Sequence, residues 1–170
     1  TPGSAEGTVV RILPIDVYGN NETTTTFDVA RGIYPAAAAG ASIINLSLGS
    51  DSNSSFLYRL IQEVSNQGVL VIAAAGNQPV ATPVYPAAYP EVLAVTAGDR
   101  QGRIAPYANH GDFVDVIAPG TAVVQFESRA YLGTGTSYAS AYVSGVAAGL
   151  VTGSGQTATE AAATLRDRLG

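Results

Sequence analysis

The sequence predicts an α/β fold in which a mostly parallel sheet is flanked by helices. Stretches with strand character alternate with stretches of helical periodicity, the pattern expected of such a fold. The run VLVIAAAG is apolar throughout, which is typical of a strand covered on both faces. A chain of 170 residues, 46% hydrophobic and 12% charged, suits one domain, and no repeat or linker divides it. We therefore expect residues 1–170 to form a single domain.

The first half of the chain alternates strands and helices. Three segments have strand character: TVVRILPIDVY (8–18), ASIINLSLG (41–49) and VLVIAAAG (69–76). The segment 26–40 has a helical pattern, with Pro35 either kinking the helix or ending its first half. The segment 54–68 is the second helix, and Gly68 suits its C-terminus. Its apolar face is predicted to comprise Phe56, Leu57, Leu60, Ile61 and Val64.

The second half of the chain is richer in strands before it ends in helices. VLAVTAG (92–98) and FVDVIAPG (113–120) are predicted strands, and AVVQFESRAYLG (122–133) is a candidate hairpin. Two helices are expected over 137–152 and 157–169, joined by the turn Gly153-Ser154-Gly155.

Composition excludes several classes of function. The net charge is −5 and no basic run is present, which argues against a nucleic-acid partner. No apolar run reaches the length of a membrane span. The chain has no cysteine, so it cannot contain a disulfide, a thiolate metal site or a cysteine nucleophile.

The stretch GTGTSYASAYVSG (133–145) places Ser137 where a loop runs into a helix. A serine at a helix start is usually a cap for free backbone N–H groups. It is a nucleophile only if a base, an orienting group and oxyanion donors surround it. GTSYA nearly matches the nucleophile elbow of α/β-hydrolases, but that arrangement requires a histidine after the serine, and none follows. An esterase of that type is therefore excluded, while cap and nucleophile both remain open.

Two predicted strands end in segments that are expected at the same edge of the sheet. VLVIAAAGN ends in Gly76 and Asn77, and INLSLG ends in Ser47, Leu48 and Gly49. Parallel strands place their carboxyl ends at one edge of the sheet, where open α/β folds have their sites. Taken alone, each segment is simply a strand followed by a turn.

Taken together and in order, these motifs resemble the subtilisin-like serine peptidases (subtilases). The resemblance runs from about Val9 to the end of the chain through VVRILP, INLSLG, VIAAAGN, YPAAYPEVLAVTAGDRQGRIAPYANHGDFVDVIAPG and GTSYASAYVSGVAAGL. It implies that Ser137 is the nucleophile of a serine endopeptidase and that Asn77 is the side-chain donor of its oxyanion hole. It also implies a polypeptide substrate, clamped by Ser47, Leu48 and Gly49 on one side and by Ala74, Ala75 and Gly76 on the other. Val84 would then line the floor of a shortened specificity pocket.

The departures from the family pattern concern the base. Subtilases carry their catalytic Asp and His upstream of the strand that VVRILP resembles, so this chain would be the C-terminal part of a catalytic domain, inactive when isolated. Asp16, His110 and Ser137 have the chain order of a triad, but Asp16 lies on the wrong strand and His110 in a turn. Ala141 and Tyr142 stand where the family usually has proline and histidine, and neither position performs chemistry.

Further expectations follow from the same resemblance. The Tyr85–Pro86 bond should be cis. The family places its Asp-bearing strand between those matching Val9–Val17 and Ile43–Leu48, so these two strands should pair directly, or the upstream fragment or a strand-exchanged copy should fill the gap.

No cofactor is expected; the family can hold structural calcium, but no ligand cluster is evident. The family suggests an extracellular or periplasmic location. The alternative is a non-catalytic subtilase-like interaction module, which the sequence upstream of Thr1 would distinguish.

Overall fold

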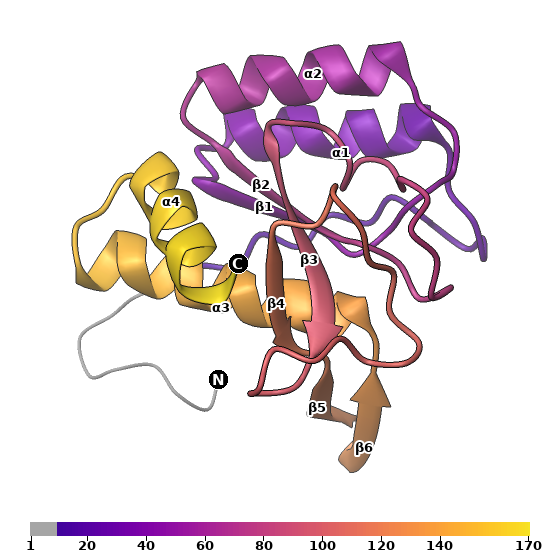
Figure 1. Cartoon of the computed structure of the whole chain (residues 1–170). Helices are drawn as coiled ribbons and strands as arrows, with labels where there is room; N and C mark the ends of the chain where they lie inside the picture. The colour runs from indigo at the N-terminus through magenta and orange to yellow at the C-terminus, as the bar shows by residue number, and fades with distance from the viewer. Residues whose placement is uncertain (1–9) are drawn as a thin grey trace.

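A four-stranded parallel sheet with the order β1-β2-β3-β4 forms the centre of the protein (Figure 1). The computed structural model describes residues 10–170. Each strand pairs in parallel with the next along the chain. The strands are β1 (Ile43–Leu46), β2 (Leu70–Ala74), β3 (Val92–Gly98) and β4 (Val116–Pro119). The predicted α/β class with a parallel sheet is therefore confirmed.

Helices cover both faces of this sheet (Figure 1). On one face, α1 (Thr26–Ala38) and α2 (Ser55–Asn66) share a buried cluster with Val71 and Ala73 of β2. On the other face, α3 (Thr136–Gly153) and α4 (Ala158–Leu169) share a second cluster with Leu70 and Ile72. Alternate residues of β2 thus enter different cores, which explains why its sequence is apolar throughout. None of the helices within residues 10–170 is long and apolar enough to cross a membrane.

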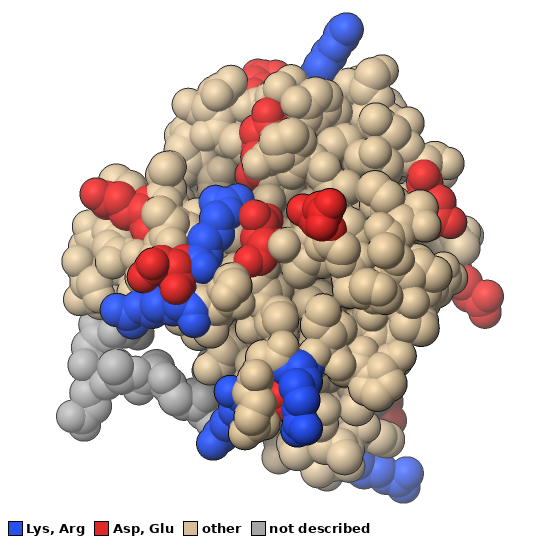
Figure 2. Space-filling view, in the orientation of Figure 1, with Lys and Arg blue, Asp and Glu red and all other residues tan. Residues whose placement is uncertain are grey.

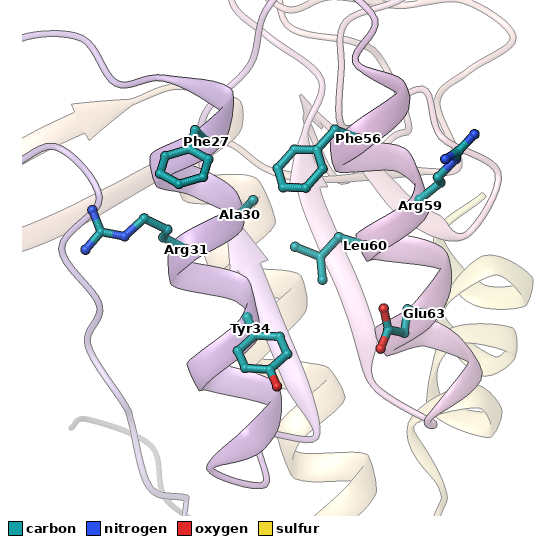
Figure 3. A pocket seen from close by; sticks show the side chains of 8 residues that line it. All are labelled: Phe27, Ala30, Arg31, Tyr34, Phe56, Arg59, Leu60 and Glu63. Carbon is teal, nitrogen blue, oxygen red and sulfur yellow. The ribbon is translucent and has the colours of Figure 1, made fainter.

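The two helices that the first half of the sequence predicts both form. Helix α1 begins after the N-cap Thr25 and continues through Pro35, which neither ends it nor divides it. Helix α2 begins after the N-cap Ser54, whose hydroxyl accepts from the Leu57 N–H. Phe56 was expected on the buried face of α2, but its side chain is 54% exposed. It lies in the first turn, beside α1 rather than over the sheet (Figure 3).

The predicted hairpin forms a separate two-stranded ribbon that projects from the body of the domain (Figure 1). It consists of β5 (Thr121–Phe126) and β6 (Arg129–Thr134), paired antiparallel. Its two turn residues, Glu127 and Ser128, have φ values of 46° and 64°. These are the left-handed angles of a tight hairpin turn that normally takes Asn-Gly.

The predicted strand at 8–18 is wrong for the part that the structure describes. Residues 8 and 9 lie outside the described residues, and residues 10–17 form no strand. Ile15 and Val17 instead contact Gly32 of α1 through their side chains. Consequently β1 is the first strand of the sheet in the described part of the chain, and the expected direct pairing of Val9–Val17 with it is wrong for residues 10–17. Residues 10–16 and Asn45 are exposed to solvent, so water can satisfy the backbone groups that such pairing would have bonded.

Candidate active site

Ser137 is the second residue of α3 and is not its cap. The N-cap is Gly135, and no side chain caps this helix. The Ser137 N–H belongs to the first turn, where backbone donors have no partner within the helix and the helix dipole favours negative charge. Within residues 10–170, the Ser137 hydroxyl makes no hydrogen bond, whereas its carbonyl accepts from the hydroxyls of Ser140 at 3.1 Å and Ser47 at 3.4 Å. The capping interpretation of Ser137 is therefore wrong.

Asn77 lies against this same helix N-terminus. Its Oδ1 accepts from the Thr136 N–H at 2.9 Å and from the Thr136 hydroxyl at 3.1 Å. Two donors on Oδ1 fix which end of the side-chain amide faces Thr136. The Nδ2 group is thereby left as the end that can donate to a bound molecule. Asn77 itself is exposed, so such a molecule can reach it.

The segment that carries Asn77 is held by its neighbours on both sides. The Gly76 N–H donates to Thr136 Oγ1 at 3.1 Å, and the Gly76 carbonyl accepts from the Asn109 N–H at 3.0 Å. The Ala75 N–H donates to the Val95 carbonyl at 2.9 Å. Ala74 and Ala75 are buried. On this side of the site, both backbone groups of Gly76 are therefore already hydrogen-bonded within the protein, and the segment forms a closed surface.

The segment Ser47–Gly49 differs in this respect. It directly follows β1, and none of its three residues makes a backbone–backbone hydrogen bond outside the sheet ladder within the described part of the chain. The Ser47 hydroxyl contacts Ser140 Oγ at 3.1 Å, which joins this segment to α3. Free backbone groups in an extended segment can bind a peptide as an added strand.

Val84 lies beneath this segment. It is 7% exposed, and its Cγ1 would lie 2.6 Å from a Cβ placed on Gly49, so only glycine fits there without a shift. Tyr85 and Ser50 exchange two backbone hydrogen bonds of 2.8 Å, which fix the Val84 segment to the end of the β1 loop. The Tyr85–Pro86 bond is cis, as the resemblance implied.

Asp16 and His110 do not complete a triad. The Asp16 carboxylate accepts from the N–H groups of Gly19 and Tyr18, and these hydrogen bonds lower its pKa. His110 is exposed, and its backbone N–H donates to the Val80 carbonyl. No hydrogen bond joins either side chain to Ser137 in residues 10–170. Within that same range, no group of three or more metal-ligating side chains is present.

A hollow of about 420 Å³ lies elsewhere, between α1 and α2 (Figure 3). Phe27 and Phe56 face each other across it, and Tyr34 and Leu60 line it further down. These helices cover the sheet face opposite to α3, so the hollow is separate from Ser137. Figure 2 shows that charged side chains are sparse on the face drawn there and that the two signs intermingle.

Two residues of the site were missed from the sequence. Thr136 organises both Gly76 and Asn77, and its position directly before Ser137 was the available signal. Asn109, which is 1% exposed, contacts the same segment from a turn 32 residues further along the chain. Nothing in the sequence around Asn109 indicates that contact.

The sheet, its helices and the placement of Ser137 beside Asn77 define a subtilisin-like α/β domain. A model of the Subtilase family matches residues 3–169, so the chain belongs to this family of serine proteases. The chain is 42% identical over 141 residues to a thermophilic serine proteinase of Bacillus sp. (strain AK1), covering 81% of this chain and 35% of that protein. It is 36% identical over 158 residues to thermitase of Thermoactinomyces vulgaris, covering 92% of this chain and 56% of thermitase.

The structure leads to the same family. A cold adapted subtilisin-like serine proteinase of known structure superposes with a TM-score of 0.78 at 28% identity, covering 86% of this chain and 55% of that one. The chain thus spans between about a third and just over half of the length of these relatives.

Proposed function

We propose that this chain supplies the nucleophile, the oxyanion hole and part of the substrate-binding surface of a serine endopeptidase. Ser137 would attack the peptide carbonyl and form an acyl-enzyme. The Ser137 N–H and the Asn77 Nδ2 group would donate to the oxyanion. Ser47–Gly49 would bind the polypeptide substrate as an added strand, with Val84 forming the floor of a short pocket.

The observation that carries the proposal is the orientation of Asn77. Both donors of Thr136 bind Oδ1, so the amide presents N–H groups at the N-terminus of the helix that carries Ser137. An oxyanion hole requires donors that are fixed before charge develops, because donors that must reorganise stabilise the transition state less. Within the described residues the Asn77 Nδ2 group makes no hydrogen bond, so it can donate to an oxyanion beside Ser137.

The proposed reaction also requires a base, which must come from outside the described residues. We place it on a segment upstream of Thr1, in keeping with the family resemblance. The open edge of β1 is where a strand of that segment, or of a second copy of this chain, would pair. Exposed strand edges accept such strands because their N–H and C=O groups have no partner within the sheet.

A fluorophosphonate probe tests the proposal, since it reacts only with an activated serine. The 170-residue chain should not react, because triad residues act as a unit; in subtilisin, itself a subtilase, losing the serine or histidine costs on the order of 10⁶ in turnover. A form extended upstream of Thr1 to the length of the relatives should react, and Ser137→Ala should abolish the reaction.

Two outcomes would count against the proposal. If the extended form binds peptides but does not react with the probe, the chain belongs to a non-catalytic interaction module. If the 170-residue chain reacts in a burst that Ser137→Ala removes, the base lies within the chain and the assignment to an upstream segment is wrong.

A further inference from the structure

Asn109 is almost completely buried, at 1% exposure, and none of the expected chemistry uses it. Its Oδ1 accepts from the Gln78 N–H at 2.7 Å, and its own N–H donates to the Gly76 carbonyl at 3.0 Å. Asn109 therefore bonds to the residues immediately before and after Asn77. Removing this buried amide should be costly, because the groups that it binds would lose their hydrogen bonds and have little access to water.

The contact between Asn109 and Gly76 is also steric. Gly76 has a φ of +109°, and a Cβ there would lie 2.7 Å from Asn109 Nδ2. The side-chain amide of Asn109 thus packs directly against the Gly76 backbone. Glycine is required at residue 76 for both reasons, its conformation and this close approach.

The turn that carries Asn109 is itself anchored. The hydroxyl of Thr96, on the buried strand β3, donates to the Asn109 carbonyl. The His110 N–H donates to the Val80 carbonyl at 3.1 Å, which continues the pairing beyond Gln78. Residues 76–80 are therefore held along their length by residues 109 and 110, and these are fixed to the central sheet.

We infer that Asn109 is a positioning residue that fixes the direction of the Asn77 amide. Thr136 holds the Asn77 side chain, and Asn109 holds the backbone from which that side chain projects. Loss of the Asn109 amide frees the Gln78 N–H and opens space beside Gly76, so the 76–78 segment can rotate. The Nδ2 group of Asn77 then no longer occupies one direction. The effect of Asn109 on catalysis rests on the proposed function, whereas its effect on the position of the Asn77 amide does not.

The first test uses NMR on the 170-residue chain. The side-chain amide signals of Asn77 are assigned by their loss in Asn77→Ala. In Asn109→Ala, we expect these signals to shift or broaden and the Gln78 amide to lose protection from hydrogen exchange. The control is Thr157→Ala, which removes a helix cap on α4 far from the site and should leave both signals unchanged. Unchanged Asn77 and Gln78 signals in Asn109→Ala would overturn the inference.

The second test measures kinetics in the form extended upstream of Thr1. Asn109→Ala should lower kcat by about 10-fold to 100-fold with little change in KM, since a misplaced group at this scale has such an effect. In an Asn77→Ala background, Asn109→Ala should lower kcat no further, because it acts through Asn77. An additive effect of the two substitutions, or a change confined to KM, would overturn the inference.

The two proposals can fail separately. If the extended form has no peptidase activity while Asn109→Ala still displaces the Asn77 signals, the proposed function is wrong and the positioning role stands. If the extended form is active and the Asn77 signals do not move, the positioning role is wrong and the proposed function stands.

Discussion

Thr136→Val removes one hydroxyl from the centre of the candidate site. That hydroxyl accepts from the Gly76 N–H and donates to Asn77 Oδ1, both at 3.1 Å. Thr136 is 1% exposed, so water cannot readily replace either bond. Valine has nearly the shape of threonine, and the substitution therefore leaves no cavity to complicate the measurement.

The expected loss of stability comes mainly from Gly76. Its N–H would remain without a partner in a partly buried position, which costs about 1–3 kcal/mol. Asn77 Oδ1 keeps its bond from the Thr136 backbone N–H, which valine retains, so its contribution is smaller. A loss of about 2 kcal/mol corresponds to a decrease in Tm of roughly 4–8 °C for a domain of this size.

Urea unfolding followed by circular dichroism measures this change, and Thr136→Ser is the matched control. Serine keeps the hydroxyl and loses one buried methyl group, which costs about 1 kcal/mol. The Gly76 amide should remain protected from hydrogen exchange in Thr136→Ser and lose protection in Thr136→Val. If the valine variant is as stable as the serine variant and its Gly76 amide stays protected, the hydroxyl does not hold this segment and the reasoning is refuted.

Three further predictions concern other parts of the fold. Burial raises the pKa of Tyr89 above its ordinary value of 10.0. The stability that the neutral Tyr89 side chain contributes is therefore complete below pH 10 and is lost as the pH rises through the folded-state pKa. Above pH 10, the free energy of unfolding should fall less steeply in Tyr89→Phe than in the parent chain. Replacing Glu127 and Ser128 by Asn and Gly should raise the free energy of unfolding in urea by about 1 kcal/mol, because both residues have left-handed backbone angles; no gain would contradict that strain. Thr157→Ala should lower that free energy by about 1 kcal/mol at pH 7, since the capping box is lost. Hydrogen bonds from Thr157 lower the pKa of Glu160, so this difference should shrink as the pH falls below 4.5; an equal difference at pH 3 would be inconsistent with the capping box.

Much of the fold could be predicted because buried helices and strands leave recognisable patterns of apolar residues in the sequence. The strand β3 has the predicted bounds, and β2 lies within its predicted segment, since β2 is a continuous apolar run and Thr96 is the only residue with a polar side chain in β3. Phe56 shows the limit of this reasoning. It satisfies the helical period, but it lies in the first turn of α2, where the neighbouring surface is α1 and not the sheet.

Some residues of the candidate site could likewise be predicted from the sequence, and others could not. Ser137 and Asn77 could be located because each lies in a sequence motif that resembles the subtilases, Ser137 at the start of a predicted helix and Asn77 just after a predicted strand. Thr136 and Asn109 could not be assigned their contacts, because these join residues that are 59 and 31 positions apart in the chain. Such contacts depend on side-chain directions, which neither periodicity nor composition specifies.

The segment before α1 shows why an apolar pattern does not by itself make a strand. Residues 10–17 have the composition of a strand, but a strand exists only where a neighbour accepts its hydrogen bonds. No neighbour pairs with them in the described part of the chain, and β1 is left with one open edge. The penalty of about 1–3 kcal/mol for an unpaired backbone group applies to buried groups, and here Asn45 and residues 10–16 are in contact with solvent. Water can therefore satisfy this edge in the isolated chain, and a pairing strand has only to displace that water. The same exposure that makes the open edge tolerable is what makes it available to the strand that the proposed function requires.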